Sequence, residues 1–567
     1  MKHCPECNKN YADPTVSFCL NDGTPLLFGA AVIEADTTLL SGDPPSESPT
    51  RHIDPHTTYP TESLHFPETR NTDFKPRSKA FWMLGGVVIV AVIAVLVGYR
   101  FIGSSGGSVS NQIESVAVLP FENGSGDPNL DYLSDGLSES LIDKLSELPQ
   151  LKVIARSSSF KYRGAGVDVA DVAKKLGVRA IVTGKVARIG DNLNVRVEMV
   201  DAAENRQMWS EEYNRKAPDL ISIKQEIAQA ASDKMRVKLS GAQEHQLAKK
   251  ETANPQAYEL LLKSRYAFSG SGTGKLREAI DYLEKAIAID PNYALAHAEL
   301  SLKYYILTGG SAADPKVYMP KAEAEARRAL ALDDNLAEAH LAISRIYVAG
   351  WRWQEGEAER KRAIDLDPNN ALAHDLYAQL LALLGRFDES IAQARRAKEL
   401  DPLSSFTACN LAYRLYFARR FDESIAESKR AQELDPESDF VQNMLGYAYA
   451  GKGQFKEAIA AYENAIRFGD ESTSIQVYLG AAYAGAGDPE KARAILKQLQ
   501  TTKDYVSPGE IAALYAALGD KEAAFASLNK AYDEHDLQLQ FLKVDPSYDP
   551  LRDDPRYQEL MKKVGLA

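Results

Sequence analysis

The chain has 567 residues, 45% hydrophobic and 26% charged, an ordinary globular composition in a chain too long for one hydrophobic core. Its formal net charge of -13 argues against nucleic acid as the main partner, because phosphate binding requires concentrated Lys and Arg. The four cysteines, three of them within the first nineteen residues, exclude a disulfide framework and indicate a local metal cluster.

A cysteine cluster opens the chain in the stretches CPEC and FCLNDGTPL. Cys4 and Cys7 have the spacing of two thiolate ligands on one zinc ion, and Cys19 supplies a third. The fourth position of a tetrahedral site falls on Asp22, with His3 as the alternative ligand. A redox CxxC pair is the competing interpretation, but no thioredoxin-like βαβ pattern surrounds these residues. The sequence therefore predicts a structural Zn2+ ion held by Cys4, Cys7, Cys19 and Asp22.

The first segment, residues 1–28, resembles the short zinc-ribbon knuckles that begin many bacterial membrane proteins. The resemblance is carried by the pattern CPxC…FCxxDGTPL and implies a small zinc ribbon. Such a ribbon can contact protein or nucleic acid, and its sequence does not decide between them. Residues 29–79 are rich in Pro, Ser, Thr and charged residues without an apolar period, so we expect a disordered linker there.

A long apolar run from Phe81 to Tyr99 contains nineteen residues without a charge. At about 1.5 Å rise per residue this length crosses roughly 30 Å of hydrocarbon, so we expect a single transmembrane helix over residues 80–102. Basic residues crowd the segment before the run and are scarce after it. The positive-inside bias then predicts a single-pass protein of the bacterial cytoplasmic membrane, with a cytoplasmic N-terminus and extracytoplasmic C-terminal domains.

After a tether over residues 103–112, residues 113–240 show strand and helix patterns in the order β-α-β-α-β-β-β-α. Within this order, Gly190-Asp191 separates two alternating runs and reads as a tight hairpin. The segment resembles the TolB amino-terminal-like domain through AVLPFENGSGDPNLDYLSDGLSESL, LKVIARSSSFKYRG, LGVRAIVTGKVARIGDNLNVRVEMVDA and QMWSEEY. The resemblance implies a compact α/β domain placed between a membrane helix and helical repeats, and it implies no catalytic activity.

Acidic residues gather around the first helix of this domain, at Asp127, Asp131, Asp135 and Glu139. Carboxylates favour the positive end of a helix dipole, which explains the cluster without catalysis. We therefore predict no active site in the domain.

From about residue 255 the sequence repeats itself. Asp367-Pro368, Asp401-Pro402 and Asp435-Pro436 follow one another at intervals of 34 residues, which is the tetratricopeptide period. The stretch SGSGTGKL lacks the residues of a phosphate-binding loop and reads as a loop between helices. We expect an all-α tetratricopeptide-repeat solenoid of about eight repeats over residues 255–540, closed by a C-terminal cap over residues 541–567.

The first helix of each repeat is expected to line the inner surface, where repeat proteins usually bind. The positions that point there in the tetratricopeptide pattern are Arg345, Asp375, Gln379, Cys409, Tyr413, Tyr416, Asn443 and Tyr447. Tyrosine and amide side chains suit a peptide or an extended segment of a protein. Packing between repeats is an alternative role for the tyrosines.

These features predict a membrane-anchored interaction scaffold that binds protein or peptide partners through extracytoplasmic TolB-like and tetratricopeptide domains. The alternative is a transmembrane signalling or transcription regulator whose zinc ribbon acts in the cytoplasm. Because the sequence shows no catalytic constellation, we predict that the chain is not an enzyme and has no small-molecule substrate.

Overall fold

The computed structural model describes residues 2–3, 10–11, 27–28, 113–164, 168–269, 273–308 and 315–567. The chain divides into two compact units, residues 1–100 and 101–567, and each is described by itself.

The first unit contributes three two-residue strands, β1 (Lys2–His3), β2 (Asn10–Tyr11) and β3 (Leu27–Phe28). Strand β1 pairs antiparallel with both β2 and β3. The predicted zinc ligands Cys4, Cys7, Cys19 and Asp22 lie outside the described residues, as does the linker over residues 29–79. The zinc ribbon therefore stays a prediction.

The predicted membrane topology is corrected by the structure. In the parts of the chain that it describes, no helix has both the length and the apolar character needed to cross a bilayer. The single-pass localisation, with its extracytoplasmic C-terminal domains, is therefore not supported. The run on which this prediction rested, residues 80–102, lies outside the described residues.

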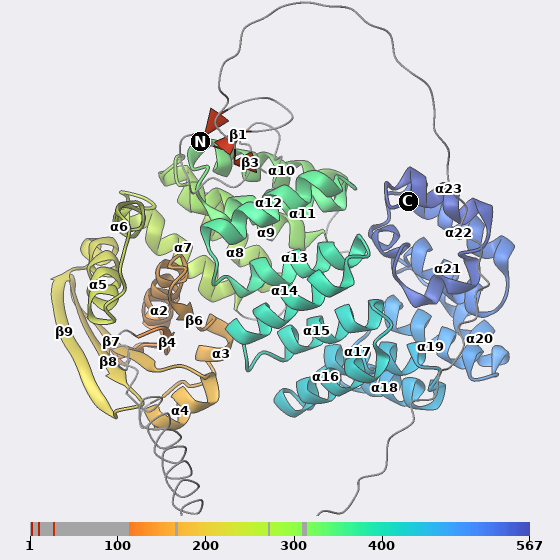
Figure 1. Ribbon diagram of the computed structural model, residues 1–567, viewed down its shortest axis with the longest axis horizontal. Helices are drawn as coiled ribbons and strands as arrows, with labels where there is room; N and C mark the ends of the chain where they lie inside the picture. The colour runs from red at the N-terminus through yellow and green to blue at the C-terminus, as the bar shows by residue number, and fades with distance from the viewer. Residues whose placement is uncertain are drawn as a thin grey trace, which may run out of the picture. The chain divides into compact units, whose positions relative to one another are not determined.

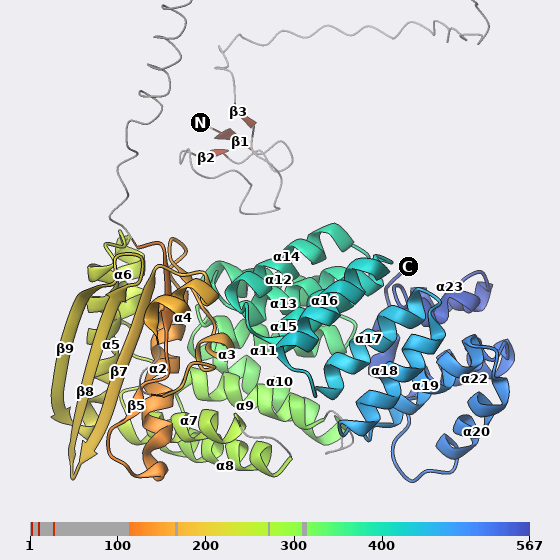
Figure 2. The same ribbon diagram turned by 90° about the horizontal axis from the view of Figure 1, so that it is seen from below.

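The second unit begins with a mixed sheet of six strands, visible from its side in Figure 2. Its order is β6-β4-β7-β8-β9, with the short β5 paired to β7. Strand β4 runs parallel to β6 and β7, whereas β7, β8 and β9 form an antiparallel meander. The strands are β4 (Ser115–Val118), β5 (Glu122–Asn123), β6 (Lys152–Val153), β7 (Ala180–Ile189), β8 (Asn192–Asp201) and β9 (Arg206–Lys216).

Two layers of helices cover the sheet because its central strands are apolar on both faces. Val116 and Val118 of β4 pack with α2 and α5, whereas Ala117 packs with α4 on the opposite face. The helices and 3-10 turns of this domain are η1 (Pro128–Leu130), α2 (Asp131–Ser146), α3 (Arg156–Ser159), α4 (Val169–Leu176), η2 (Ala217–Asp219), α5 (Leu220–Lys234) and α6 (Gly241–Ala248). The predicted element order is confirmed, including the hairpin at Gly190, whose positive φ of 61° suits glycine.

Eight helix pairs follow in the described residues and confirm the predicted tetratricopeptide-type solenoid (Figure 1). The pairs are α7 (Pro255–Phe268) with α8 (Thr273–Ile289), α9 (Ala294–Leu307) with α10 (Pro315–Leu332), α11 (Ala337–Ala349) with α12 (Trp353–Leu366), α13 (Ala371–Leu383) with α14 (Phe387–Leu400), α15 (Ser405–Phe417) with α16 (Phe421–Leu434), α17 (Asp439–Gly451) with α18 (Phe455–Arg467), α19 (Thr473–Gly485) with α20 (Pro489–Leu499), and α21 (Pro508–Ala517) with α22 (Lys521–Asp533).

Because of the repeat period, residues with the same structural role recur at the same position in successive repeats. Ser404, Ser438 and Ser472 each cap a first helix by accepting a hydrogen bond from the amide three residues later. Gly446 allows close contact inside its repeat, because a Cβ there would lie 2.2 Å from the ring of Tyr462. These features explain why the spacing in the sequence predicts the helix pairs.

The chain ends in η4 (Leu537–Phe541), η5 (Pro546–Leu551) and α23 (Pro555–Lys563). This C-terminal segment packs back onto earlier repeats. Trp353 of α12 donates a hydrogen bond to the carbonyl oxygen of Val564 at 2.8 Å, and Arg419 pairs with Asp549 at 2.6 Å. Trp351 stacks on His535 with ring centroids 4.8 Å apart.

The α/β domain and the first repeat share one hydrophobic core. Gly136 of α2 lies against Leu262 of α7, and a Cβ at Gly136 would be only 2.8 Å from that leucine. The buried hydroxyl of Tyr258 hydrogen bonds to Ser140 at 2.9 Å. The second unit is therefore continuous across this junction.

Candidate functional site

The predicted inner-face residues lie on the first helices of four successive repeats, α11, α13, α15 and α17. These residues are Arg345, Asp375, Gln379, Cys409, Tyr413, Tyr416, Asn443 and Tyr447. The structure places some of them against the α/β domain, some against the C-terminal segment, and the others in different surroundings.

An aromatic cluster formed with the C-terminal segment contains the three tyrosines. Tyr413 lies between Tyr447 and Phe541, with ring centroids 5.7 Å and 6.2 Å away. The hydroxyl of Tyr416 hydrogen bonds to Asp545 at 3.1 Å. Burial raises the pKa of Tyr413 well above its ordinary value. This part of the inner face is thus occupied by the chain's own C-terminal segment, which favours the packing role for these tyrosines.

Three further predicted residues have different surroundings. Cys409 is fully buried, and burial raises the pKa of its thiol to about 12, so it remains protonated. Asn443 donates a hydrogen bond to Asp470 at 2.5 Å. Gln379 is half-buried on α13.

Arg345 and Asp375 line a cavity of about 550 Å³ between the α/β domain and the repeats. One wall is formed by α2 and α3, and the other by the first helices of repeats one to five, α7, α9, α11, α13 and α15. We call this space the inner cavity. A second cavity of about 200 Å³ lies on the other side of Asp143, Glu338 and Asp367, which line both spaces.

Polar contacts fix the α/β domain against the loops that precede α13 and α15. Asp401 accepts hydrogen bonds from Ser157 and Ser158, both at 2.5 Å. The Asn369 amide group donates to the carbonyl oxygens of Ser146 and Leu148 at 3.1 Å and 3.0 Å. These contacts join residues more than 200 positions apart and hold the two walls in place.

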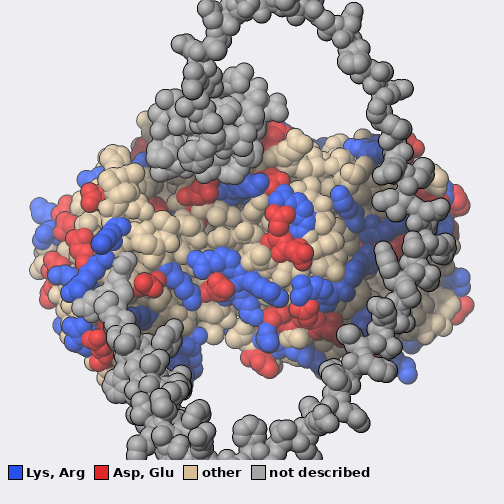
Figure 3. Space-filling view, in the orientation of Figure 1, with Lys and Arg blue, Asp and Glu red and all other residues tan. Residues whose placement is uncertain are grey.

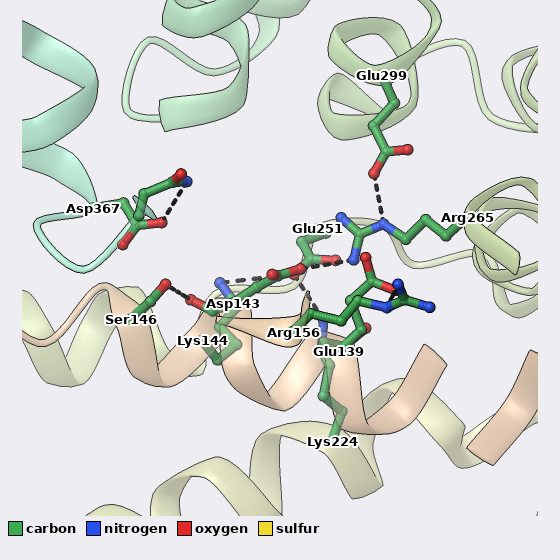
Figure 4. Close-up of polar contacts among 12 residues, drawn as sticks. Glu139, Asp143, Lys144, Ser146, Arg156, Lys224, Glu251, Arg265, Glu299 and Asp367 are labelled. Carbon is green, nitrogen blue, oxygen red and sulfur yellow. Dashed lines mark hydrogen bonds and ion pairs between the residues drawn. The ribbon is translucent and has the colours of Figure 1, made fainter. Parts of the chain in front are cut away.

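Ion pairs cover part of the inner cavity's wall (Figure 4). The Arg265 guanidinium lies between Glu299, at 2.6 Å, and Asp143, at 2.7 Å. Lys303 also contacts Glu299, at 3.1 Å. Arg156 pairs with Glu139 at 3.1 Å, so Glu139 belongs to this wall rather than only to the start of its helix. These pairs satisfy much of the buried charge.

Two carboxyl groups at the boundary of the cavities lack a cationic partner. Among the described residues, no donor reaches Oδ1 of Asp367, although Asn370 donates to its Oδ2 at 3.0 Å. No ion pair to Glu338 occurs within 4.0 Å in the same described ranges. Burial raises the pKa of Glu338 to about 8 and that of Asp367 to about 7. Figure 4 shows Asp367 apart from the ion pairs around Arg265.

Exposed apolar side chains surround the inner cavity. Phe268, Leu372 and Phe406 all line it, and they are 38%, 40% and 55% exposed. We call these three residues the apolar rim. Phe406 stacks on Phe440 with ring centroids 5.5 Å apart, which holds its exposed ring in place. An apolar rim around a polar floor is typical of a site that binds an amphipathic ligand.

Two of the residues predicted from the sequence, Arg345 and Asp375, line the inner cavity, but the cavity itself was not predicted. From the sequence, Asp367 and Asp401 were identified only as marks of the repeat period. No local pattern shows that α2 and α3 lie opposite the first helices of the repeats. In the described ranges, no group of His, Cys, Asp and Glu side chains has the arrangement of a metal site.

Both parts of the second unit contain stretches that are similar to known protein families. Residues 111–230 match the family model of the second domain of HilA/YgeH-like transcriptional regulators. Residues 266–293 and 441–468 match the tetratricopeptide repeat. The resemblance to the TolB amino-terminal-like domain stays a prediction.

One curated relative is the "Putative adenylate cyclase 3" of Rhizobium meliloti (strain 1021), 37% identical over 188 residues. The match covers 33% of this chain and 32% of the relative, so the chain spans about a third of that protein's length. The prediction that the chain is not an enzyme is contradicted by this relative, whose name is that of an enzyme.

Solved structures that match parts of this chain include two tetratricopeptide proteins. One comes from Parabacteroides merdae ATCC 43184, with 14% identity and a TM-score of 0.36, covering 47% of this chain and 99% of that one. Another is YrrB, described as a TPR protein with an unusual peptide-binding site, with 20% identity and a TM-score of 0.25, covering 33% of this chain and 93% of that one.

Proposed function

We propose that this protein is an interaction scaffold that binds a protein segment at the inner cavity, between its α/β domain and its repeats. The observation that carries the proposal is the apolar rim of Phe268, Leu372 and Phe406 around a cavity of about 550 Å³. Exposed apolar groups at the mouth of a concave site provide the area that a partner's side chains bury.

The rest of the inner face supports this choice of site. The C-terminal segment already contacts Tyr413 and Tyr416, so a partner would have to displace it there. At the inner cavity, by contrast, the fixed contacts of Asp401 and Asn369 leave open space between two walls. A preformed site of this kind loses little free energy to reorganisation on binding.

The test is selection of short peptides from a random library on the full chain. We expect selected peptides to lose binding in the Phe268→Ser/Phe406→Ser double variant, because it removes two aromatic groups of the apolar rim. The matched control is Ile466→Ser, which changes an exposed apolar residue of α18 that does not line the inner cavity. Peptides that bind the double variant as well as the unchanged protein would contradict the proposal.

A second candidate function is a signalling or transcription regulator, which the match to HilA/YgeH-like regulators favours. The net charge of -13 favours action through protein contacts rather than through DNA phosphates. On the face shown in Figure 3, acidic and basic side chains are interspersed, so that face offers no purely basic surface. Salt-dependent binding of the full chain to duplex DNA, measured by fluorescence anisotropy, would instead indicate direct contact with DNA.

A further inference from the structure

We propose that the inner cavity receives a lysine or arginine side chain of the partner segment, while the apolar neighbours of that residue pack on the apolar rim. This inference rests on the proposed function and adds the chemistry of the segment that is bound.

The charges that line the inner cavity favour a cation. Seven carboxylates line it against four cationic side chains: Glu139, Asp143, Glu299, Glu338, Asp367, Asp375 and Asp401 against Arg156, Arg265, Lys303 and Arg345. Most of them have partners in the chain, as Asp375 has in Arg414 at 3.6 Å and Asp401 in its hydroxyl donors. The lining carboxyl groups left without an ion pair or paired hydroxyl donors among the described residues are Glu338 and Asp367.

Asp367 is the strongest single indication of a missing partner. Its side chain is 5% exposed, and its Oδ1 has no donor in hydrogen-bond geometry among the described residues. The Ser146 hydroxyl, which lies close enough to lower the pKa of Asp367, donates to the carbonyl oxygen of Asp143. A buried acceptor without a donor is unfavourable, and such groups in native proteins usually have a ligand or a structural reason. Glu338 lies at the same boundary and also lacks an ion pair among the described residues.

The raised pKa values of these two carboxyl groups are what is expected of carboxyls that have no cation beside them. Burial and the neighbouring Asp143 raise the pKa of Glu338 to about 8, and burial raises that of Asp367 to about 7. A cation placed between them would favour their ionised forms. An ammonium or guanidinium group donates several hydrogen bonds and can therefore pair with more than one carboxylate.

The apolar rim favours a peptide side chain over a free amine as the source of that cation. A free amine would leave Phe268, Leu372 and Phe406 exposed, whereas a peptide can cover them with apolar side chains on either side of its basic residue. The inner cavity, at about 550 Å³, also exceeds the space of a single ion. A segment with one basic residue between apolar residues matches both features.

The experiment uses the full chain and pairs of synthetic peptides. Each pair consists of a peptide with a central lysine or arginine between leucine and phenylalanine residues, and the same peptide with norleucine or citrulline in the central position. We expect the charged peptide to bind at least about ten-fold more tightly, which corresponds to about 1.4 kcal/mol.

The protein variants for this test are Glu338→Gln and Asp367→Asn, with the exposed Glu437→Gln as the matched control. We expect each cavity variant to weaken the charged peptide about ten-fold, to leave the neutral peptide unchanged, and to keep the melting temperature at pH 8 the same or higher. The control should bind both peptides like the unchanged protein. Neither substitution breaks an ion pair among the described residues, so an unchanged melting temperature would show that lost affinity does not result from unfolding.

The outcomes separate this inference from the proposed function. Peptides that depend on the apolar rim but bind equally well with a neutral centre would overturn the cation site and leave the proposed function standing. If no peptide depends on the apolar rim, both fail. If spermidine competes at the affinity of the charged peptide and shows the same loss in Glu338→Gln, the assignment to a protein partner is overturned in favour of a small amine.

Discussion

Glu338 gives the interface between α2 and the repeats a pH dependence of known sign. Burial raises the pKa of its carboxyl to about 8, whereas an unfolded glutamate titrates near about 4.3. Between these values the folded protein holds a proton that the unfolded chain has released. The free energy of unfolding therefore falls as pH rises, by up to about 1.4 kcal/mol per pH unit for this group.

Glu338→Gln should make that fall shallower between pH 5 and pH 8, because glutamine has no proton to release. The measurement is the urea midpoint of the full chain at several pH values, with Glu437→Gln as the control. We expect the midpoint of Glu338→Gln at pH 8 to exceed that of the unchanged protein. If the urea midpoints of Glu338→Gln and of the unchanged protein changed in parallel with pH, Glu338 would titrate like an exposed carboxyl.

At the scale of elements, η4 packs between repeats that are far apart in the sequence. Leu539 and Leu542 are fully buried, and Phe541 stacks on Phe417 of α15 with ring centroids 5.5 Å apart. Two residues that lie near the C-terminal segment have strained backbones. Trp351 and Arg419 adopt positive φ values of 59° and 62°, which are unfavourable for residues other than glycine. Trp351 stacks on His535, just before η4, and Arg419 pairs with Asp549 of η5.

Leu542→Ala should weaken the packing of η4 and lower the free energy of unfolding by about 2–5 kcal/mol, as expected for a fully buried leucine. Leu537→Ala is the control, because Leu537 is the first residue of η4, whereas Leu542 directly follows η4, and Leu537 is 43% exposed. Limited proteolysis should release the segment after residue 535 faster in Leu542→Ala than in the control. Equal rates for both variants would mean that η4 contributes little to holding the segment.

The predicted zinc ribbon can be tested by metal content. We expect one Zn2+ per chain in protein purified under reducing conditions, measured by mass spectrometry of the metal. Asp22→Ala should lower the zinc affinity at least about ten-fold because it removes the fourth ligand, whereas His3→Ala should leave it unchanged. The opposite pattern would assign the fourth ligand to His3, and metal-free protein would refute the ribbon.

The second unit shows what periodicity can and cannot predict. A 34-residue period and alternating strands predicted its helix pairs and its sheet, because both signals are local. The inner cavity depends instead on contacts such as that between Ser158 and Asp401, which are 243 positions apart. Helical spacing placed Tyr413 and Arg345 on the inner face equally well. Helical spacing could not show that the C-terminal segment covers Tyr413, whereas Arg345 lines a cavity.

As a whole, the second unit should unfold cooperatively across the junction between the sheet and the repeats. Leu262 of α7 is fully buried, and it contacts Gly136 of α2 in the core that both parts share. A cavity made at Leu262 removes packing from the sheet domain and from the first repeat together. Hydrogen exchange reports such opening element by element, because amides exchange only when their local structure opens.

Leu262→Ala should therefore speed exchange in β4 and β7 as well as in α7 and α8. Leu479→Ala, a buried leucine of α19 in the seventh repeat, is the control and should speed exchange in neighbouring repeats without affecting β4. If Leu262→Ala changed exchange only in α7 and α8, the sheet would be stable without the repeats. In that case the shape of the inner cavity would depend on the polar contacts between its walls, such as those of Asn369, Asp401 and Arg265.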